Sequence, residues 1–143
     1  MVMETTAAPE TVLIVEDNEM NLKLARELLQ IDGLDTIEAA TGTDGVALAR
    51  SRHPDVVVTD IQLPDLDGWS ALRRLREDPT LADLVVVAVT AFATAGDEAR
   101  FLAGGFDGYL PKPIDARTFA QAIREFYARG RLTARDTEPT KGT

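Results

Sequence analysis

Residues 56–67 read VVVTDIQLPDLD, and this stretch decides the fold. Its first four residues form a short apolar run typical of a strand buried on both faces, and Asp60 ends the run where the strand would reach the surface. A similar run, VLIV, is followed directly by Glu16 and Asp17, and a lone Lys112 follows a third run. If these runs are neighbouring strands, three carboxylates meet at one sheet edge, where their repulsion is costly without a cation among them. The pattern predicts a metal-binding edge with a chemical role.

Short apolar runs alternate with segments of helical period along the central part of the chain. The strands are expected at residues 12–15, 35–38, 56–59, 84–89 and 108–110, with a helix after each. Strand and helix repeated five times indicate a parallel sheet covered by helices on both faces. The predicted fold is therefore a single doubly wound (βα)5 domain of the α/β class, a flavodoxin-like three-layer sandwich with strand order 2-1-3-4-5.

The helices are predicted from apolar spacing, capping residues and helix breakers. The first should bury Leu24, Leu28 and Ile31, which recur at three- and four-residue spacing. The second helix is expected from about Thr43 to Ser51. The third, from about Gly68 to Glu77, should bury Leu72 and Leu75 and turn outward the side chains of Arg73, Arg74 and Arg76. The fourth should be capped near Thr94 and end at Gly104-Gly105, and the fifth should be capped by Asp115 and have as its inner face Phe119, Ala122, Ile123 and Phe126.

The predicted strand order also predicts where a ligand binds. In such a sheet the site lies beyond the carboxyl ends of strands 1 and 3, where the winding direction reverses. Glu16 and Asp17 follow the first expected strand, Asp60 closes the third, Thr90 closes the fourth and Lys112 closes the fifth. Five polar groups far apart in the sequence would therefore share one edge of the sheet.

The composition indicates one domain with a tail at each end. With 143 residues, of which 45% are hydrophobic and 27% charged, the chain can bury a proper core. Residues 1–10 are rich in Thr, Ala, Pro and Glu, and residues 131–143 are polar. We therefore expect a flexible N-terminal tail at 1–10, the domain at 11–130, and a flexible C-terminal tail at 131–143.

Charge and residue usage exclude several classes of function. The net charge of −9 argues against a nucleic acid or an anionic membrane surface as partner. The absence of cysteine excludes a disulfide scaffold, thiol catalysis and a cysteine-based zinc site. The first ten residues do not read as a signal peptide, and no apolar run approaches the ~20 residues of a membrane span. We therefore expect a cytoplasmic protein without membrane insertion.

The motifs at the strand ends resemble those of a known family. The residues that carry the resemblance are Glu16-Asp17, Asp60 within the segment TDIQLP, Asp67-Gly68, Thr90-Ala91, Tyr109 and Lys112-Pro113. In this order and at these positions they resemble the receiver domain of bacterial two-component response regulators, the CheY-like family. The stretches VEDNEMN, DIQLP and AVTAFA are similar to those of the single-domain, DivK-type regulators of cell division.

The resemblance implies a role for each residue of the edge. Asp60 would be the phosphoacceptor, whose carboxylate attacks a phosphohistidine of a partner protein to form an acyl phosphate. The residues implied to bind Mg²⁺, or Mn²⁺ in its place, are Asp17, Asp60, the backbone carbonyl of Gln62 and, mainly through water, Glu16. The groups implied to hold the phosphoryl oxygens are the Lys112 ammonium, the Thr90 hydroxyl and the backbone N–H of Ala91.

The resemblance also implies a switch. Movement of Thr90 toward the phosphoryl group would vacate space into which the ring of Tyr109 turns, and the surface of the fourth helix, fifth strand and fifth helix would report the change. The positions that tune hydrolysis in the family are occupied here by Gln62 and Phe92. Because Phe92 is bulky and apolar, we expect it to restrict the hydrolytic water and to prolong the life of the phosphoryl group. The bond between Lys112 and Pro113 would be cis in the family.

The expected partners are proteins. The phosphoryl donor would be a histidine kinase or a histidine phosphotransfer protein, and the signal would pass to a downstream protein target. The regulator itself is expected to be a monomer that can dimerise on phosphorylation. Such a protein would not be an enzyme beyond its own phosphorylation and dephosphorylation. One alternative is a relay that passes the phosphoryl group onward. A less favoured alternative is an aspartate-nucleophile phosphatase of the haloacid dehalogenase type, which would require a second Asp at the position that Gln62 occupies in this chain. No GxxxxGK[ST] loop supports nucleotide hydrolysis.

Overall fold

The computed structural model describes residues 9–91 and 97–141, except for the side chains of residue 98 and of residues 131–141. Strands and helices alternate along this part of the chain. The strands are β1 (Thr11–Val15), β2 (Asp35–Ala39), β3 (Val56–Asp60), β4 (Val85–Thr90) and β5 (Gly108–Pro111). The helices are α1 (Glu19–Ile31), α2 (Gly42–Arg52), α3 (Gly68–Glu77), the short 3-10 helix η1 (Pro79–Leu81), α4 (Asp97–Ala103) and α5 (Phe119–Lys141).

The strands form one parallel sheet in the order β2-β1-β3-β4-β5, as predicted. In this register Val15 lies beside Thr59, and Asp60 lies beside Val89. The carboxyl ends of β1, β3 and β4 are therefore neighbours. The topology confirms the fold class and brings the expected site residues to one edge.

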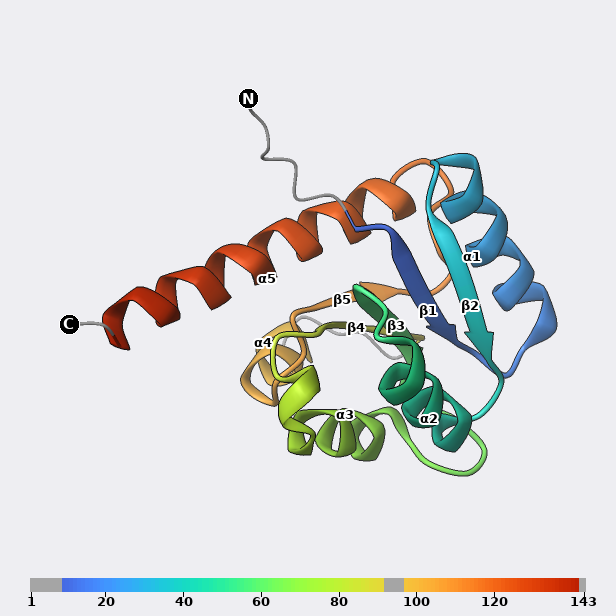
Figure 1. Ribbon diagram of the computed structural model, residues 1–143. Coiled ribbons are helices and arrows are strands. Elements are labelled where there is room, and N and C mark those ends of the chain that lie inside the picture. The colour runs from blue at the N-terminus through green and yellow to red at the C-terminus, as the bar shows by residue number, and fades with distance from the viewer. Residues whose placement is uncertain (1–8, 92–96, 142–143) are drawn as a thin grey trace.

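Helices cover both faces of the sheet (Figure 1). Helices α1 and α5 pack on one face, and α2, α3 and α4 pack on the other. Along β3, Val56 and Val58 face the first group of helices while Val57 faces the second. Burial on both faces is the reason that this strand reads as an unbroken apolar run and not as an alternating one.

The expected inner face of α1 was wrong in part. Leu24 is exposed and Ile31 is 84% exposed, whereas Ala25 and Leu29 are buried against the sheet, with Leu28 partly buried beside them. Both sets of residues repeat at helical spacing. Periodicity alone could therefore not decide which stripe of the helix meets the sheet.

The third helix packs as predicted except for Arg76. Leu72 and Leu75 are buried, but Arg76 does not simply face solvent. Its guanidinium pairs with Asp107 at 2.9 Å and donates to the backbone carbonyls of Leu84 and Gly105. Arg76 therefore ties the end of α3 to the start of β4 and to the turn before β5.

The last helix differs from the expectation in its length. The Asp115 carboxylate accepts a hydrogen bond from the amide of Arg117, and the helix begins at Phe119, with Phe119 and Ile123 buried. Residues 131–141 continue α5, which extends beyond the edge of the sheet (Figure 1). The helix is therefore longer than expected, because helical structure was expected to end near residue 130. Residues 128–135 contain Ala, Arg and Leu, which favour helix. The division of the chain into a core and two tails stays a prediction.

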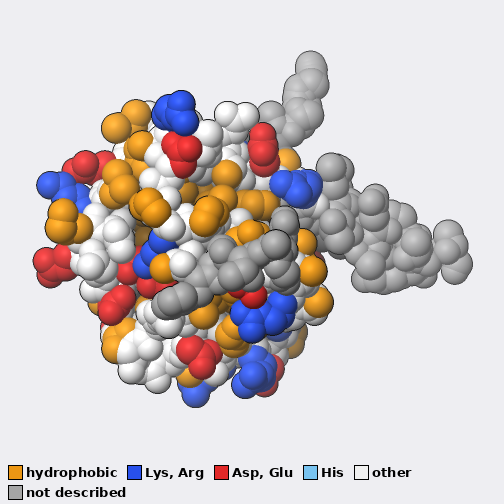
Figure 2. Space-filling model, turned by 180° about the vertical axis from the view of Figure 1, so that it is seen from behind, with side chains coloured by type: hydrophobic (Ala, Val, Ile, Leu, Met, Phe, Trp, Pro, Cys, Tyr) orange, Lys and Arg blue, Asp and Glu red, His pale blue; other side chains and the backbone are white. Residues whose placement is uncertain are grey.

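One face of the molecule is mixed in charge. Acidic and basic side chains are interspersed over the face seen in Figure 2. Within the described residues, no helix combines the length and the apolar character that crossing a membrane requires.

The expected cap of α4 near Thr94 lies outside the described residues, and α4 is followed by Gly104-Gly105 as predicted.

Candidate functional site

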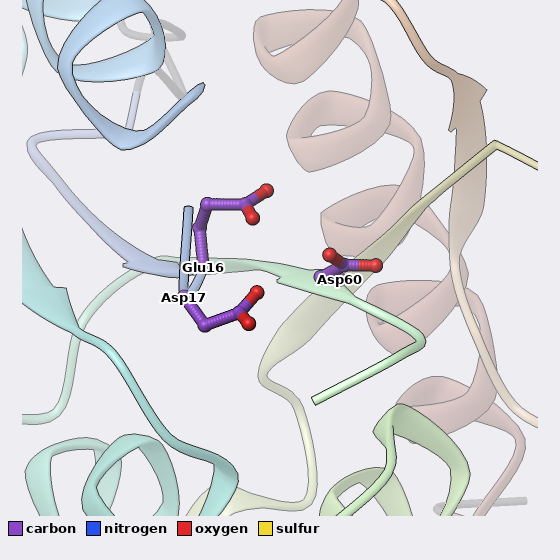
Figure 3. Close-up of side chains that lie close together, drawn as sticks. All are labelled: Glu16, Asp17 and Asp60. Carbon is purple, nitrogen blue, oxygen red and sulfur yellow. The ribbon is translucent and has the colours of Figure 1, made fainter. Parts of the chain in front are cut away.

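Three carboxylates converge at the carboxyl edge of the sheet, as the sequence predicted. Glu16 and Asp17 follow β1 and Asp60 ends β3, and each offers an oxygen within 4.8 Å of the others. Figure 3 shows the carboxylates of Glu16 and Asp17 directed to the side on which Asp60 lies. Glu16 and Asp60 are buried, whereas Asp17 is exposed. The group combines oxygen ligands suited to a small divalent cation with one side open to solvent.

Lys112 lies between two of these acids. Its ammonium nitrogen is 2.8 Å from a carboxylate oxygen of Asp60 and 2.9 Å from one of Glu16. The backbone amide of Lys112 donates to the carbonyl of Thr90 at 2.9 Å, which ties the end of β5 to the end of β4. The peptide bond between Lys112 and Pro113 is cis.

The electrostatics of the edge follow from burial and pairing. Burial raises the pKa of the Glu16 carboxyl above its ordinary value, although hydrogen bonds from Lys112 and from the amide of Asn18 oppose the shift. Burial alone would lower the pKa of the Lys112 ammonium, but hydrogen bonds to Asp60 and Glu16 outweigh it, and the pKa lies above its ordinary value. Lys112 is therefore a fixed positive charge at neutral pH. One ammonium among three acids leaves an excess of negative charge that a metal cation would offset.

The loop after β3 holds Asp60 in place. The amide of Gln62 donates to a carboxylate oxygen of Asp60 at 3.1 Å, and the amide of Ile61 donates to the carbonyl of Val89 at 3.3 Å. Farther along, Asp67 caps α3 by accepting from the amide of Ser70. The second carboxylate oxygen of Asp60 is the one that faces Lys112.

The expected phosphate-binding residues lie beside this edge. Thr90 ends β4 and is buried, and Ala91 follows it at an exposed position. The expected hydrolysis-tuning residue Phe92 lies outside the described residues. His53, the single histidine of the chain, lies elsewhere, at the C-cap of α2.

Tyr109 belongs to a layer of four aromatic rings that sequence reasoning did not find. Its ring stacks on Phe101 of α4 with centroids 5.5 Å apart, and Phe101 stacks on Trp69 of α3 at 5.2 Å. Phe106 contacts both Trp69 and Phe101 edge to face. We call these four residues the aromatic layer. The expected switch residue, Tyr109, is thereby connected through Phe101 to α3. In the sequence, only the aromatic content of residues 101–109 could have indicated the aromatic layer.

Sequence reasoning also missed Asp65. Its carboxylate accepts hydrogen bonds from the amides of Gly42 at 2.9 Å and Thr43 at 3.0 Å, which belong to the first turn of α2. The segment from Gln62 to Asp67 has the look of an ordinary polar turn. The sequence contains no local signal that Asp65 binds amides of a helix that lies 22 to 23 residues earlier in the chain.

Comparison with known proteins identifies the class to which this fold and this edge belong. Residues 12–124 match the response regulator receiver domain, which covers most of the chain. The chain belongs to the response regulator receiver domain family.

Particular relatives narrow the comparison. The chain is 43% identical over 117 residues to the polar-differentiation response regulator DivK of Brucella ovis, a match that covers 82% of this chain and 95% of that protein. It is 42% identical over 118 residues to DivK of Brucella anthropi, with 82% and 96% covered. The chain is thus a DivK homologue, and these two relatives contain little beyond the matched domain.

Solved structures agree with this assignment. The receiver domain of a sensor histidine kinase from Pseudomonas aeruginosa PAO1, which has a magnesium ion coordinated in its active-site cleft, is 30% identical with a TM-score of 0.76, covering 85% of this chain and 99% of that one. A CheY-like receiver domain protein from Methanospirillum hungatei JF-1 is 25% identical with a TM-score of 0.77, covering 87% and 98%. Both confirm the CheY-like fold of this chain.

Proposed function

We propose that this chain is a DivK-type response regulator that accepts a phosphoryl group on Asp60 from a phosphohistidine and signals by binding other proteins. One observation carries the proposal: the Asp60 carboxylate is held at 2.8 Å from the Lys112 ammonium, inside a cluster of three carboxylates at the carboxyl edge of the sheet. A buried acid that served only as a turn residue would not need such a setting. The match to DivK supports the single-domain form of this role.

The transfer uses Asp60 as nucleophile. One of its oxygens forms a bond to phosphorus while the bond between phosphorus and the imidazole nitrogen of the donor breaks, and the electron pair of the broken bond returns to the imidazole. The hydrogen bond from the Gln62 amide orients the carboxylate. After transfer, the Lys112 ammonium pairs with a phosphoryl oxygen in place of Asp60. The Thr90 hydroxyl and the Ala91 amide bind further oxygens.

The carboxylate cluster fits Mg²⁺, and Mn²⁺ in its place. Its donors are oxygens only, they are close together, and Asp17 faces solvent, which suits an ion that keeps part of its hydration shell. Asp17, Asp60 and the Gln62 carbonyl would hold the ion, with Glu16 reaching it mainly through water. When bound, the cation offsets carboxylate repulsion and stabilises charge on the phosphoryl oxygens. The magnesium in the related Pseudomonas receiver domain supports this assignment.

The response would run through Thr90 and Tyr109. Thr90 lies at the end of β4 and Tyr109 on the neighbouring strand β5, where Ala88 and Tyr109 are paired in the sheet. A shift of the Thr90 hydroxyl toward the phosphoryl group favours a different packing of the Tyr109 ring, and the surface of α4, β5 and α5 changes with it. A downstream target protein reads that surface.

An apolar stripe on α1 supports a protein as donor. Met20, Leu24 and Ile31 are 81%, 38% and 84% exposed, and their spacing of four and seven residues puts them along one side of the helix. The stripe begins four residues after Glu16, beside the edge that the donor's phosphohistidine must reach. Replacing Met20 and Ile31 by Ala should slow transfer from a histidine kinase or phosphotransfer protein and leave labelling by a small phosphodonor unchanged. Equal slowing with both donors would contradict this surface.

The central experiment is direct phosphorylation. Incubation with a small phosphodonor and Mg²⁺, followed by intact-mass measurement, should add one phosphoryl group to the parent and none to an Asp60→Asn variant. Failure to label the parent, or equal labelling of the variant, would overturn the proposal. Transfer onward from Asp60 to a phosphotransfer histidine would identify the relay form of the same role. Steady turnover of a phosphate ester would identify a phosphatase of the haloacid dehalogenase type.

A further inference from the structure

The loop between β3 and α3 is fastened to the first turn of α2 by one side chain. The two carboxylate oxygens of Asp65 accept from two different amides, one from Gly42 at 2.9 Å and the other from Thr43 at 3.0 Å. Amides of the first turn have no partner within their own helix, and the helix dipole favours an anion there. Asp65 therefore acts as a cap supplied by a distant loop.

A second observation shows how closely the loop approaches α2. A Cβ atom added at Gly42 would overlap the backbone carbonyl oxygen of Leu66. The absence of a side chain at residue 42 is therefore required for the contact that Asp65 makes. Leu66 and Leu63 also pack partly buried against the core on this face of the sheet.

The loop is consequently fixed on both sides of Gln62. On one side the Gln62 amide donates to Asp60 at 3.1 Å, and Ile61 is bonded through its amide to Val89 and through its carbonyl to the amide of Gly68. On the other side only Leu63 and Pro64 separate Gln62 from Asp65, and proline restricts the backbone between them. The orientation of the peptide that carries the Gln62 carbonyl thus depends on the anchor at Asp65.

We propose that Asp65 is a positioning residue, which holds the loop on α2 so that the backbone carbonyl of Gln62 is already oriented for the Mg²⁺ ion. The inference rests on the proposed function, since it concerns the metal that the carboxylate cluster would bind. Its physical basis is preorganisation. A loop that is ordered before the ion arrives loses less conformational freedom on binding than a loop that the ion itself must order.

The test is calorimetric titration of the unphosphorylated full chain with MgCl₂. Asp65→Ala should weaken Mg²⁺ binding about tenfold, the lower end of what outer-shell residues contribute to metal affinity. Asp65→Asn should weaken it less, because the amide oxygen still accepts one hydrogen bond. Asp44→Asn is the matched control, since Asp44 is an exposed acid in the same first turn of α2, and it should bind Mg²⁺ like the parent.

A kinetic measurement separates positioning from loss of structure. In Asp65→Ala, the Mg²⁺ concentration for half-maximal phosphorylation by a small donor should rise about tenfold, while the rate at saturating Mg²⁺ stays near that of the parent. Gly42→Ala, which displaces Leu66, should give the same pattern and takes the place of Asp65→Ala if that variant does not fold. Parental affinity in these variants would overturn the inference. Absence of Mg²⁺ binding by the parent would instead contradict the proposed function.

Discussion

The carboxylate edge and the aromatic layer belong to the same domain but are built in different ways. The edge consists of charges held by short polar contacts, with Lys112 within 2.9 Å of both Glu16 and Asp60. The aromatic layer consists of rings contributed by α3, α4, the turn before β5 and β5 itself, in contact through their faces and edges. Directional polar contacts fix atoms for chemistry, whereas ring packing has alternative arrangements of similar energy. In the proposed function, the edge would accept the phosphoryl group and the aromatic layer would respond to its arrival.

The largest expected effect is on the edge. Replacing Lys112 by Met removes the only positive charge in contact with Glu16 and Asp60 among the described residues. We expect phosphorylation by a small donor to slow by about 10²–10³-fold, comparable to the loss of one donor to a developing oxyanion. Intact mass followed over time measures the rate. Lys23→Met, which removes an exposed lysine of α1, should leave the rate unchanged; a Lys112 variant with the rate of the Lys23 variant would contradict the assigned role.

The next prediction concerns the aromatic layer. Phe101→Leu removes the ring between Tyr109 and Trp69, and we expect it to lower the free energy of unfolding by about 1.5–4.5 kcal/mol, from three lost ring pairs. Phosphorylation of Asp60 should proceed at the parental rate. The fluorescence of Trp69, the single tryptophan, should respond to phosphorylation in the parent and much less in the variant.

Phe119→Leu is the matched control for this prediction. Phe119 is as buried as Phe101, at 2% exposure, but lies in the core cluster on the opposite face of the sheet. Phe119→Leu should lose stability and keep the Trp69 response. If both variants kept the full response, the aromatic layer would be ordinary core, and its contrast with the edge would disappear.

A smaller effect is expected from Phe92, whose prediction rests on the sequence. Phe92→Asn should admit water to the acyl phosphate and shorten its lifetime about tenfold, which corresponds to about 1.4 kcal/mol in the barrier. Loss of the phosphoryl mass after removal of the donor measures this lifetime. An unchanged decay rate would mean that residue 92 does not limit access of water.

The smallest effect concerns the loop beside the edge and its dependence on pH. A hydrogen bond with the Thr43 side chain lowers the pKa of Asp65, desolvation opposes this, and the amides of Gly42 and Thr43 lower the pKa further, from 3.8 to about 2. Because the pKa of Asp65 is lower in the folded state, its carboxylate stabilises the fold at pH values above its ordinary pKa. This contribution is lost as the pH falls toward 2. The stability difference between the parent and Asp65→Asn should therefore be constant above about pH 4 and shrink below it. Urea unfolding at a series of pH values measures the difference, and a gap that widened in acid would show the opposite sign.

Sequence reasoning succeeded where a residue's position follows from the end of its own strand. Glu16, Asp17, Asp60, Thr90 and Lys112 were placed on one edge because the carboxyl ends of parallel strands meet there. It failed where two faces of an element were equally plausible, as for Leu24 and Ile31 on α1, and where a polar side chain found a tertiary partner, as Arg76 did with Asp107. It gave no indication of Asp65 or of the stack through Phe101, because neither depends on neighbours in the chain.

The sequence by itself determined the family, the parallel sheet and the set of charges around Asp60, since apolar runs and the residues that end them are local patterns. Only the tertiary structure decided which stripe of α1 is buried, that Asp65 caps α2, and that Tyr109 is stacked through Phe101 on Trp69. The ring and capping contacts join residues separated by 8 to 32 positions, and their geometry depends on how helices pack on the sheet, for which the spacing of residues along the chain holds no signal.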